Sequence, residues 1–179
     1  GSIPLSAEDE VGLVGELTLL GKMIGAGISP VIAVNAWVGP TADGIRDFAL
    51  GFGAIEVKTT VSSNGFVARI GSLEQLDDTN CKPIFMGAIR FALTEGGHTL
   101  PEKVAEISEI LQSDPLALAD FEDRLLAAGY LITHAPQYHR RFSLREMALL
   151  EVDKSFPCMS HGNVKPGIVS ARYEVNLEH

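Results

Sequence analysis

One Asp, one Glu and one Lys side chain stand where strand interiors are normally apolar, in the stretch IRDFALGFGAIEVKTT at residues 45–60. Asp47 lies in one apolar run, and Glu56 and Lys58 flank a valine in the next. Alternate residues of a strand share a face, so the side chains of Glu56 and Lys58 point the same way. The stretch therefore predicts a carboxylate and an ammonium group together on one face of a strand.

Asp47 joins them if Phe48 pairs with Ile55 across the short connection between the two runs, because Asp47 then lies opposite Glu56. Carboxylates this close repel each other and raise each other's pKa unless a cation lies between them. Oxygen ligands suit Mg²⁺ or Mn²⁺, which commonly take one or two carboxylates and keep several waters. The spacing thus predicts Asp47 and Glu56 as ligands of Mg²⁺ (or Mn²⁺).

Lys58 adds a positive charge that a metal-bound carboxylate pair could use in phosphodiester hydrolysis. An ammonium group beside the carboxylates can hold or deprotonate an attacking water and can stabilise negative charge developing on a phosphate. A divalent cation, an activated water and a fixed positive charge are the parts of phosphodiester hydrolysis. The bare pattern is weak, because Glu-x-Lys triplets are common by chance. The alternative is a solvated strand face that alternates Glu and Lys.

The elements that position these residues follow from periodicity and turn signals. A helix is predicted over residues 7–25, because it has an apolar stripe at helical spacing, and Ser6 can cap it. Glu16 flanks that stripe. A short helix is predicted from Pro30, and the Asn64-Gly65 pair predicts a hairpin. The other predicted elements are strands at 45–50, 54–60, 66–70, 83–93, 142–152 and 168–175, and helices at 101–112 and 114–128.

The whole reads as an α/β fold, a mixed β-sheet flanked by α-helices. The 179 residues fit one domain. Residues 1–2 and 177–179 resemble a cloning remnant and the start of a histidine tag, so the domain is predicted over 3–176. No apolar run is long enough to span a bilayer and no signal peptide is visible, which favours a cytoplasmic protein without a membrane partner.

The net charge of −9 argues against a broad phosphate-binding surface, although it leaves room for a local nucleic-acid site. The histidines form no zinc-binding pattern. Trp37 is interpreted as a packing residue rather than a base-stacking one. His161 alone does not support a histidine-dependent nuclease, because no second histidine or metal pattern accompanies it.

Several segments together resemble the bacterial PD-(D/E)XK motif proteins: VGLVGELTLL, AWVGP, RDFAL, AIEVKTT and GSLEQL. That family belongs to the restriction-endonuclease-like nuclease superfamily and is often associated with restriction or phage-defence gene clusters. The later segments LLEVDKSFPCMS and SARYEVNL resemble its C-terminal strands. The resemblance implies a restriction-endonuclease-like core and a longer full-length protein, of which this chain is the C-terminal part.

Carried over by position, the resemblance assigns Asp47 and Glu56 to the metal and Lys58 to catalysis. Glu16 matches an acidic residue that completes the metal site in many members. Gln75, in SLEQL, matches a polar residue placed beside that site.

One position departs from the family pattern: Arg46 stands where the usual proline precedes the motif aspartate. Asp43 is a rival for the first carboxylate, but it lies in a turn-rich loop, so Asp47 is preferred.

The resemblance implies a Mg²⁺-dependent DNA endonuclease, or a nuclease subunit, acting in bacterial restriction or phage defence. Its expected partners are DNA and other proteins of the restriction or defence system. The alternative is a catalytically inactive member that serves as a DNA-binding or assembly module. A third interpretation is a structural domain whose strand charges are simply solvated.

Overall fold

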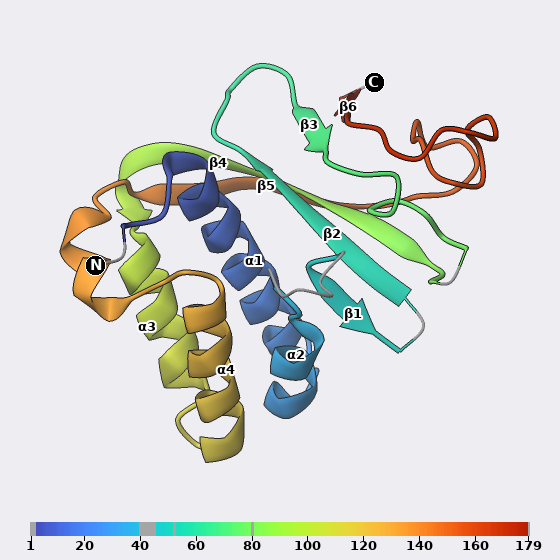
Figure 1. Cartoon of the computed structure of the whole chain (residues 1–179). Coiled ribbons are helices and arrows are strands. Elements are labelled where there is room, and N and C mark those ends of the chain that lie inside the picture. Colours follow the sequence, from blue (N-terminus) through green and yellow to red (C-terminus); the bar gives the residue numbers. More distant parts are fainter. Residues whose placement is uncertain (1–2, 40–45, 52, 80, 179) are drawn as a thin grey trace.

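The computed structural model describes residues 3–39, 46–51, 53–79 and 81–178 (Figure 1). Its helices are α1 (Ala7–Gly25), α2 (Pro30–Ala36), α3 (Leu100–Ile110), α4 (Pro115–Ala127) and the 3₁₀ helix η1 (Ile132–Gln137). Its strands are β1 (Phe48–Leu50), β2 (Gly53–Thr60), β3 (Val67–Ile70), β4 (Ile84–His98), β5 (Phe142–Glu151) and β6 (Tyr173–Asn176).

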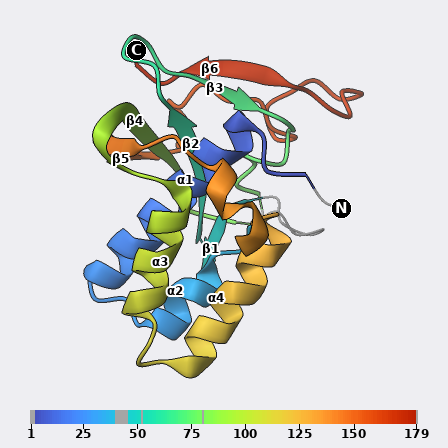
Figure 2. The same ribbon diagram turned by 90° about the vertical axis from the view of Figure 1, so that its left-hand side faces the viewer.

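The main sheet has the strand order β1-β2-β4-β5. Strand β2 is parallel to β4, whereas β1 and β5 pair antiparallel with their neighbours, so the sheet is mixed. The four α-helices lie on one side of this sheet, and the small β3-β6 sheet lies on the other (Figures 1 and 2). The predicted α/β class is confirmed, and the arrangement is consistent with a restriction-endonuclease-like core.

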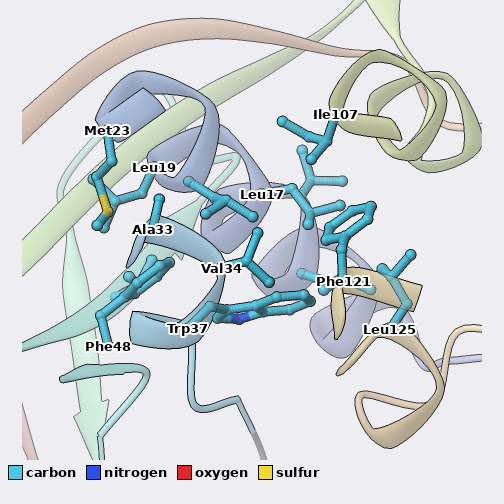
Figure 3. Close-up of a cluster of buried hydrophobic side chains, with 14 of the residues drawn as sticks. Leu17, Leu19, Met23, Ala33, Val34, Trp37, Phe48, Ile107, Phe121 and Leu125 are labelled. Atoms are coloured by element: carbon cyan, nitrogen blue, oxygen red, sulfur yellow. The ribbon is translucent and has the colours of Figure 1, made fainter. Parts of the chain in front are cut away.

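Two apolar clusters hold these layers together. The larger one joins the helices to the main sheet, and Figure 3 shows Leu17, Trp37, Phe48 and Phe121 meeting in it. Trp37 is 0% exposed, and its ring centroid lies 5.9 Å from that of Phe121. This confirms Trp37 as a packing residue. The smaller cluster joins β4 and β6, with Met86 fully buried in it.

Each α-helix begins directly after a residue whose side chain caps its first turn. The Ser6 hydroxyl accepts a hydrogen bond from the backbone N–H of Asp9 at 3.1 Å, as predicted. Ser29, Thr99 and Asp114 cap α2, α3 and α4 in the same way. Each cap satisfies a backbone N–H that lacks a partner inside its helix. Among the described residues, no helix is long and apolar enough to cross a membrane.

The predicted hairpin between residues 54–60 and 66–70 is wrong. Strand β3 pairs with β6, and the second neighbour of β2 is the parallel strand β4. The turn at Asn64-Gly65 does form, with Gly65 at φ +73°. The Arg90 side chain, from β4, donates a hydrogen bond to the carbonyl oxygen of Gly65 at 3.2 Å and so fixes the position of this turn. Strand β2 is buried on both faces, so the apolar β4 suits it better than the half-exposed β3.

The other differences concern the ends of elements. Strand β4 extends to His98, past the apolar run that predicted it, through the polar and glycine residues at 94–98. The last strand begins at Tyr173 rather than near residue 168. Strand β1 begins at Phe48, so Asp47 directly precedes it.

Substituting alanine for each of two glycines of α1 is expected to change the free energy of unfolding in opposite directions. A Cβ on Gly15 would lie 2.2 Å from Cγ2 of Thr59, whereas a Cβ on Gly12 would meet nothing within 4 Å. Gly15→Ala should therefore lower the free energy of unfolding by about 1–3 kcal/mol through overpacking. Gly12→Ala should raise it by about 0.5–1 kcal/mol, because alanine favours helix. Urea unfolding of both variants tests this packing, and equal effects would contradict it.

Candidate active site

Asp47 lies beside Glu56 because β1 and β2 pair in the predicted register. Phe48 pairs with Ile55, which places Asp47 beside Glu56 where the β1-β2 pairing ends. The Asp47 carboxylate Oδ2 accepts a hydrogen bond from the backbone N–H of Val57 at 2.8 Å. Because β1 is short, this part of β2 has no strand partner on that side among the described residues, and Asp47 supplies the acceptor.

The backbone of Asp47 is fixed by the segment that follows α2. Its carbonyl oxygen accepts hydrogen bonds from the N–H groups of Val38 at 2.9 Å and Gly39 at 3.3 Å. Trp37 forms an isolated antiparallel bridge with Phe48. Residues 37–39 therefore position the first carboxylate.

Glu56 and Lys58 form an ion pair on their shared face of β2. The distance between Lys58 Nζ and Glu56 Oε1 is 3.3 Å, and the side chains are 19% and 6% exposed. The second carboxylate oxygen of Glu56, Oε2, is buried and has no hydrogen-bond partner among the described residues. A buried carboxylate oxygen without a donor is costly, so it marks a place for a cation or a proton.

Glu16 reaches the same place from α1. Its Oε1 accepts a hydrogen bond from the indole N–H of Trp37 at 2.9 Å. It interacts electrostatically with Asp47, Glu56 and Lys58. The structure thus brings together four of the five residues singled out in the sequence, with Lys58 as the cation nearest to the carboxylates.

The pKa values of the three carboxyl groups report this crowding. Burial and then the Asp47 charge raise the pKa of Glu16 to about 8, although the Trp37 hydrogen bond lowers it in part. Burial and the Asp47 charge also raise the pKa of Glu56 to about 8 against the effect of Lys58. Burial raises the pKa of Asp47, opposed by the Val57 hydrogen bond and Lys58. If all three carboxyl groups were ionised, their negative charge would exceed the positive charge of Lys58, so the protonated forms of Glu16 and Glu56 are favoured near neutral pH.

Gln75 is placed differently. Its carboxamide oxygen accepts a hydrogen bond from the backbone N–H of Gly71 at 3.1 Å, within its own loop. The structure shows no hydrogen bond that ties it to the carboxylates among the described residues, so its role beside the site stays a prediction. Asp43, the rival carboxylate, lies outside the described residues. His161 bonds to Glu74, with Nε2 2.7 Å from Oε1.

Arg46 is a residue whose part in the site the sequence did not reveal. Its guanidinium donates to the carbonyl oxygens of Glu74, at 2.9 Å, and Asp77. Its charge also lowers the pKa of Glu56. The residue that replaces the family proline therefore ties the 71–77 loop to the start of β1. Its position directly before Asp47 is the one signal that pointed to it.

The carboxylates fit a divalent cation in donor type and in number. Asp47 and Glu56 offer oxygen only, one Glu56 oxygen lacks a donor, and Mg²⁺ commonly takes one or two carboxylates with waters completing its shell. Among the described residues, no group of three or more His, Cys, Asp or Glu side chains forms a ready-made metal cage. One oxygen each of Glu16 and Asp47 is already bonded to the protein.

The Trp37–Glu16 hydrogen bond should be visible in the pH dependence of stability. Trp37→Phe removes the indole N–H that donates to Glu16 Oε1 and should cost about 1–3 kcal/mol. The loss should be larger at pH 9 than at pH 6, because Glu16 is ionised above its pKa of about 8. Phe121→Leu removes aromatic packing without touching that bond, so its cost should not vary with pH. A pH-independent cost for Trp37→Phe would contradict the hydrogen bond.

A mixed sheet flanked by helices, with Asp, Glu and Lys gathered where β1 meets β2, defines the PD-(D/E)XK class of protein. The family model DUF4420, described as "Putative PD-(D/E)XK family member", matches residues 1–178. The chain belongs to this family. No match was found among curated proteins or among solved structures.

Proposed function

We propose that this chain is a divalent-metal-dependent DNA endonuclease, or a nuclease subunit, of a bacterial restriction or phage-defence system. One observation carries the proposal: the Asp47 and Glu56 carboxylates lie together at the end of the β1-β2 pairing with Lys58 3.3 Å from Glu56. Membership of the PD-(D/E)XK family supports it, since nucleases of this superfamily usually use divalent metals.

Asp47 and Glu56 are the residues that would hold Mg²⁺ or Mn²⁺. When bound, such a cation supplies Lewis acidity toward a phosphoryl oxygen. Lys58 would leave its ion pair with Glu56 and stabilise negative charge as it develops on the phosphate, in a partly buried place where a fixed charge is worth more than in water. Glu16, held in position by the Trp37 indole N–H, would complete the metal site from α1.

A second candidate is a catalytically inactive DNA-binding or assembly module of a defence complex. The net charge of −9 favours it, because an acidic chain repels DNA over much of its surface. In that case another protein of the complex would supply most of the contacts to DNA.

Cleavage of a labelled DNA substrate in Mg²⁺ or Mn²⁺, with wild type beside Asp47→Asn, separates the candidates. A nuclease should cut only with metal, and the variant should not cut. Metal-dependent binding without cutting would favour the inactive module. Cutting in the presence of a chelator, or equal cutting by the variant, would contradict the proposed metal site.

A further inference from the structure

A narrow groove opens beside Lys58, outside the carboxylate cluster. It lies between the first turns of α1, the Val57–Thr59 segment of β2, and β3, and its volume is about 250 Å³. Sites that enclose a whole small molecule usually measure about 300–1,000 Å³. This groove is therefore better suited to a segment of a longer ligand than to a complete small one.

Arg69 supplies a second positive charge to this groove. It lines the groove from β3, it is exposed, and it forms no ion pair or side-chain hydrogen bond among the described residues. Its cross-strand neighbour is Glu174 on β6, but the structure, which describes both side chains, shows no ion pair between them. The guanidinium is thus available to an anion, and arginine matches phosphate geometry with paired N–H donors.

Gly12, on the opposite wall of the groove, has no side chain to occupy the space. It lines the groove in the second turn of α1, and a Cβ there would meet nothing within 4 Å. Packing inside the protein therefore does not require a glycine here, although glycine in a helix interior costs about 1 kcal/mol relative to alanine. Close approach of a ligand to the helix backbone would use this open space.

The floor of the groove is an open strand edge. No described strand pairs with Val57–Thr59 on the β1 side, and the Val57 N–H is taken by Asp47. Alternate residues of a strand direct their backbone groups to the same side, so we expect the Thr59 N–H to face this edge as well. That N–H is a donor suited to a phosphate or sugar oxygen.

We infer that the groove holds one unpaired strand of nucleic acid, with a phosphate on Arg69 and the strand continuing past Lys58. This inference rests on the proposed nuclease function and adds its substrate class: single-stranded or strand-separated DNA. Glu8, on the α1 side, repels phosphate, which places the backbone of the strand on the Arg69 side.

Fluorescence anisotropy of a labelled single-stranded oligonucleotide, measured without added divalent metal, tests the groove directly. Arg69→Ala should weaken binding by about tenfold, because it removes a charge-assisted contact, and should reduce the salt dependence by about one counterion. Gly12→Leu should weaken binding by a similar factor by filling the groove. Glu8→Gln should strengthen binding.

Two matched variants control for charge and for the added side chain. Arg145→Ala removes an exposed arginine on β5, and Gly25→Leu adds a side chain to α1 where a Cβ also meets nothing within 4 Å. Both should bind within twofold of wild type. Equal losses in a test variant and its control, absent binding by wild type, or tighter binding of a duplex than of the single strand would overturn the inference.

Cleavage in Mn²⁺, measured on the same oligonucleotide, keeps the two proposals apart. If wild type binds through Arg69 and Gly12 but does not cut, the nuclease function fails and the groove stands. If wild type cuts and the Arg69 and Gly12 variants bind and cut as it does, the groove fails and the nuclease function stands.

Discussion

Replacing Lys58 with alanine is expected to slow Mn²⁺-dependent DNA cleavage by at least about 10²-fold. Lys58 is the cation nearest to the carboxylates, with Nζ 3.3 Å from Glu56 Oε1. Its removal takes away the fixed positive charge that would stabilise the phosphate in the transition state. The measurement is the single-turnover rate at saturating DNA, so that weaker binding does not enter.

Lys22→Ala is the control for the loss of one lysine, because Lys22 lies in the last turn of α1, away from this cluster. It should cut at the wild-type rate. A Lys58→Ala variant that cuts within a few fold of wild type would remove Lys58 from the chemistry. Circular dichroism of each variant establishes that the fold is retained.

The metal-free protein is expected to lose stability as the pH rises from about 5 to about 8. Glu16 and Glu56 both have folded-state pKa values raised from 4.5 to about 8. In this window the folded chain therefore binds more protons than the unfolded chain, so unfolding becomes easier with increasing pH. A one-unit difference in pKa between the folded and unfolded chain corresponds to about 1.4 kcal/mol, so the loss should be at least about 2–4 kcal/mol. Urea unfolding at several pH values measures this slope.

Asp47→Asn should make that slope shallower, because the Asp47 charge raises the pKa of both glutamates. Its carboxamide oxygen can still accept the Val57 N–H, so the variant should be at least as stable as wild type at pH 8. Asp123→Asn, at an exposed position on α4, is the control and should leave the slope unchanged. A wild-type stability that is flat or rising between pH 5 and 8 would contradict the crowded carboxylates.

The clustering of Asp47, Glu56 and Lys58 was predictable from the sequence because it depends on local geometry. Strand alternation and a short connection place Asp47, Glu56 and Lys58 together, and both depend on neighbouring residues only. Glu16 could be placed because the apolar stripe of α1 fixes which side of the helix faces the sheet.

The pairing of the later strands was not predictable in the same way. The Asn64-Gly65 turn is real, but a turn signal does not say whether the strands beside it pair with each other. Strand β2 needs an apolar neighbour on its remaining edge, and the distant β4 supplies it. Arg46 was missed for a similar reason, since its partners at Glu74 and Asp77 lie in a loop far along the chain.

Calorimetric titration of the metal-free protein with Mn²⁺ tests the central claim most directly, because it requires neither DNA nor activity. Wild type should show saturable binding, since a cation between Asp47 and Glu56 relieves their repulsion. Asp47→Asn and Glu56→Gln should show none, whereas Asp123→Asn should bind as wild type does. Wild-type heats equal to those of dilution, or unchanged binding by Asp47→Asn, would show that these carboxylates are not a metal site.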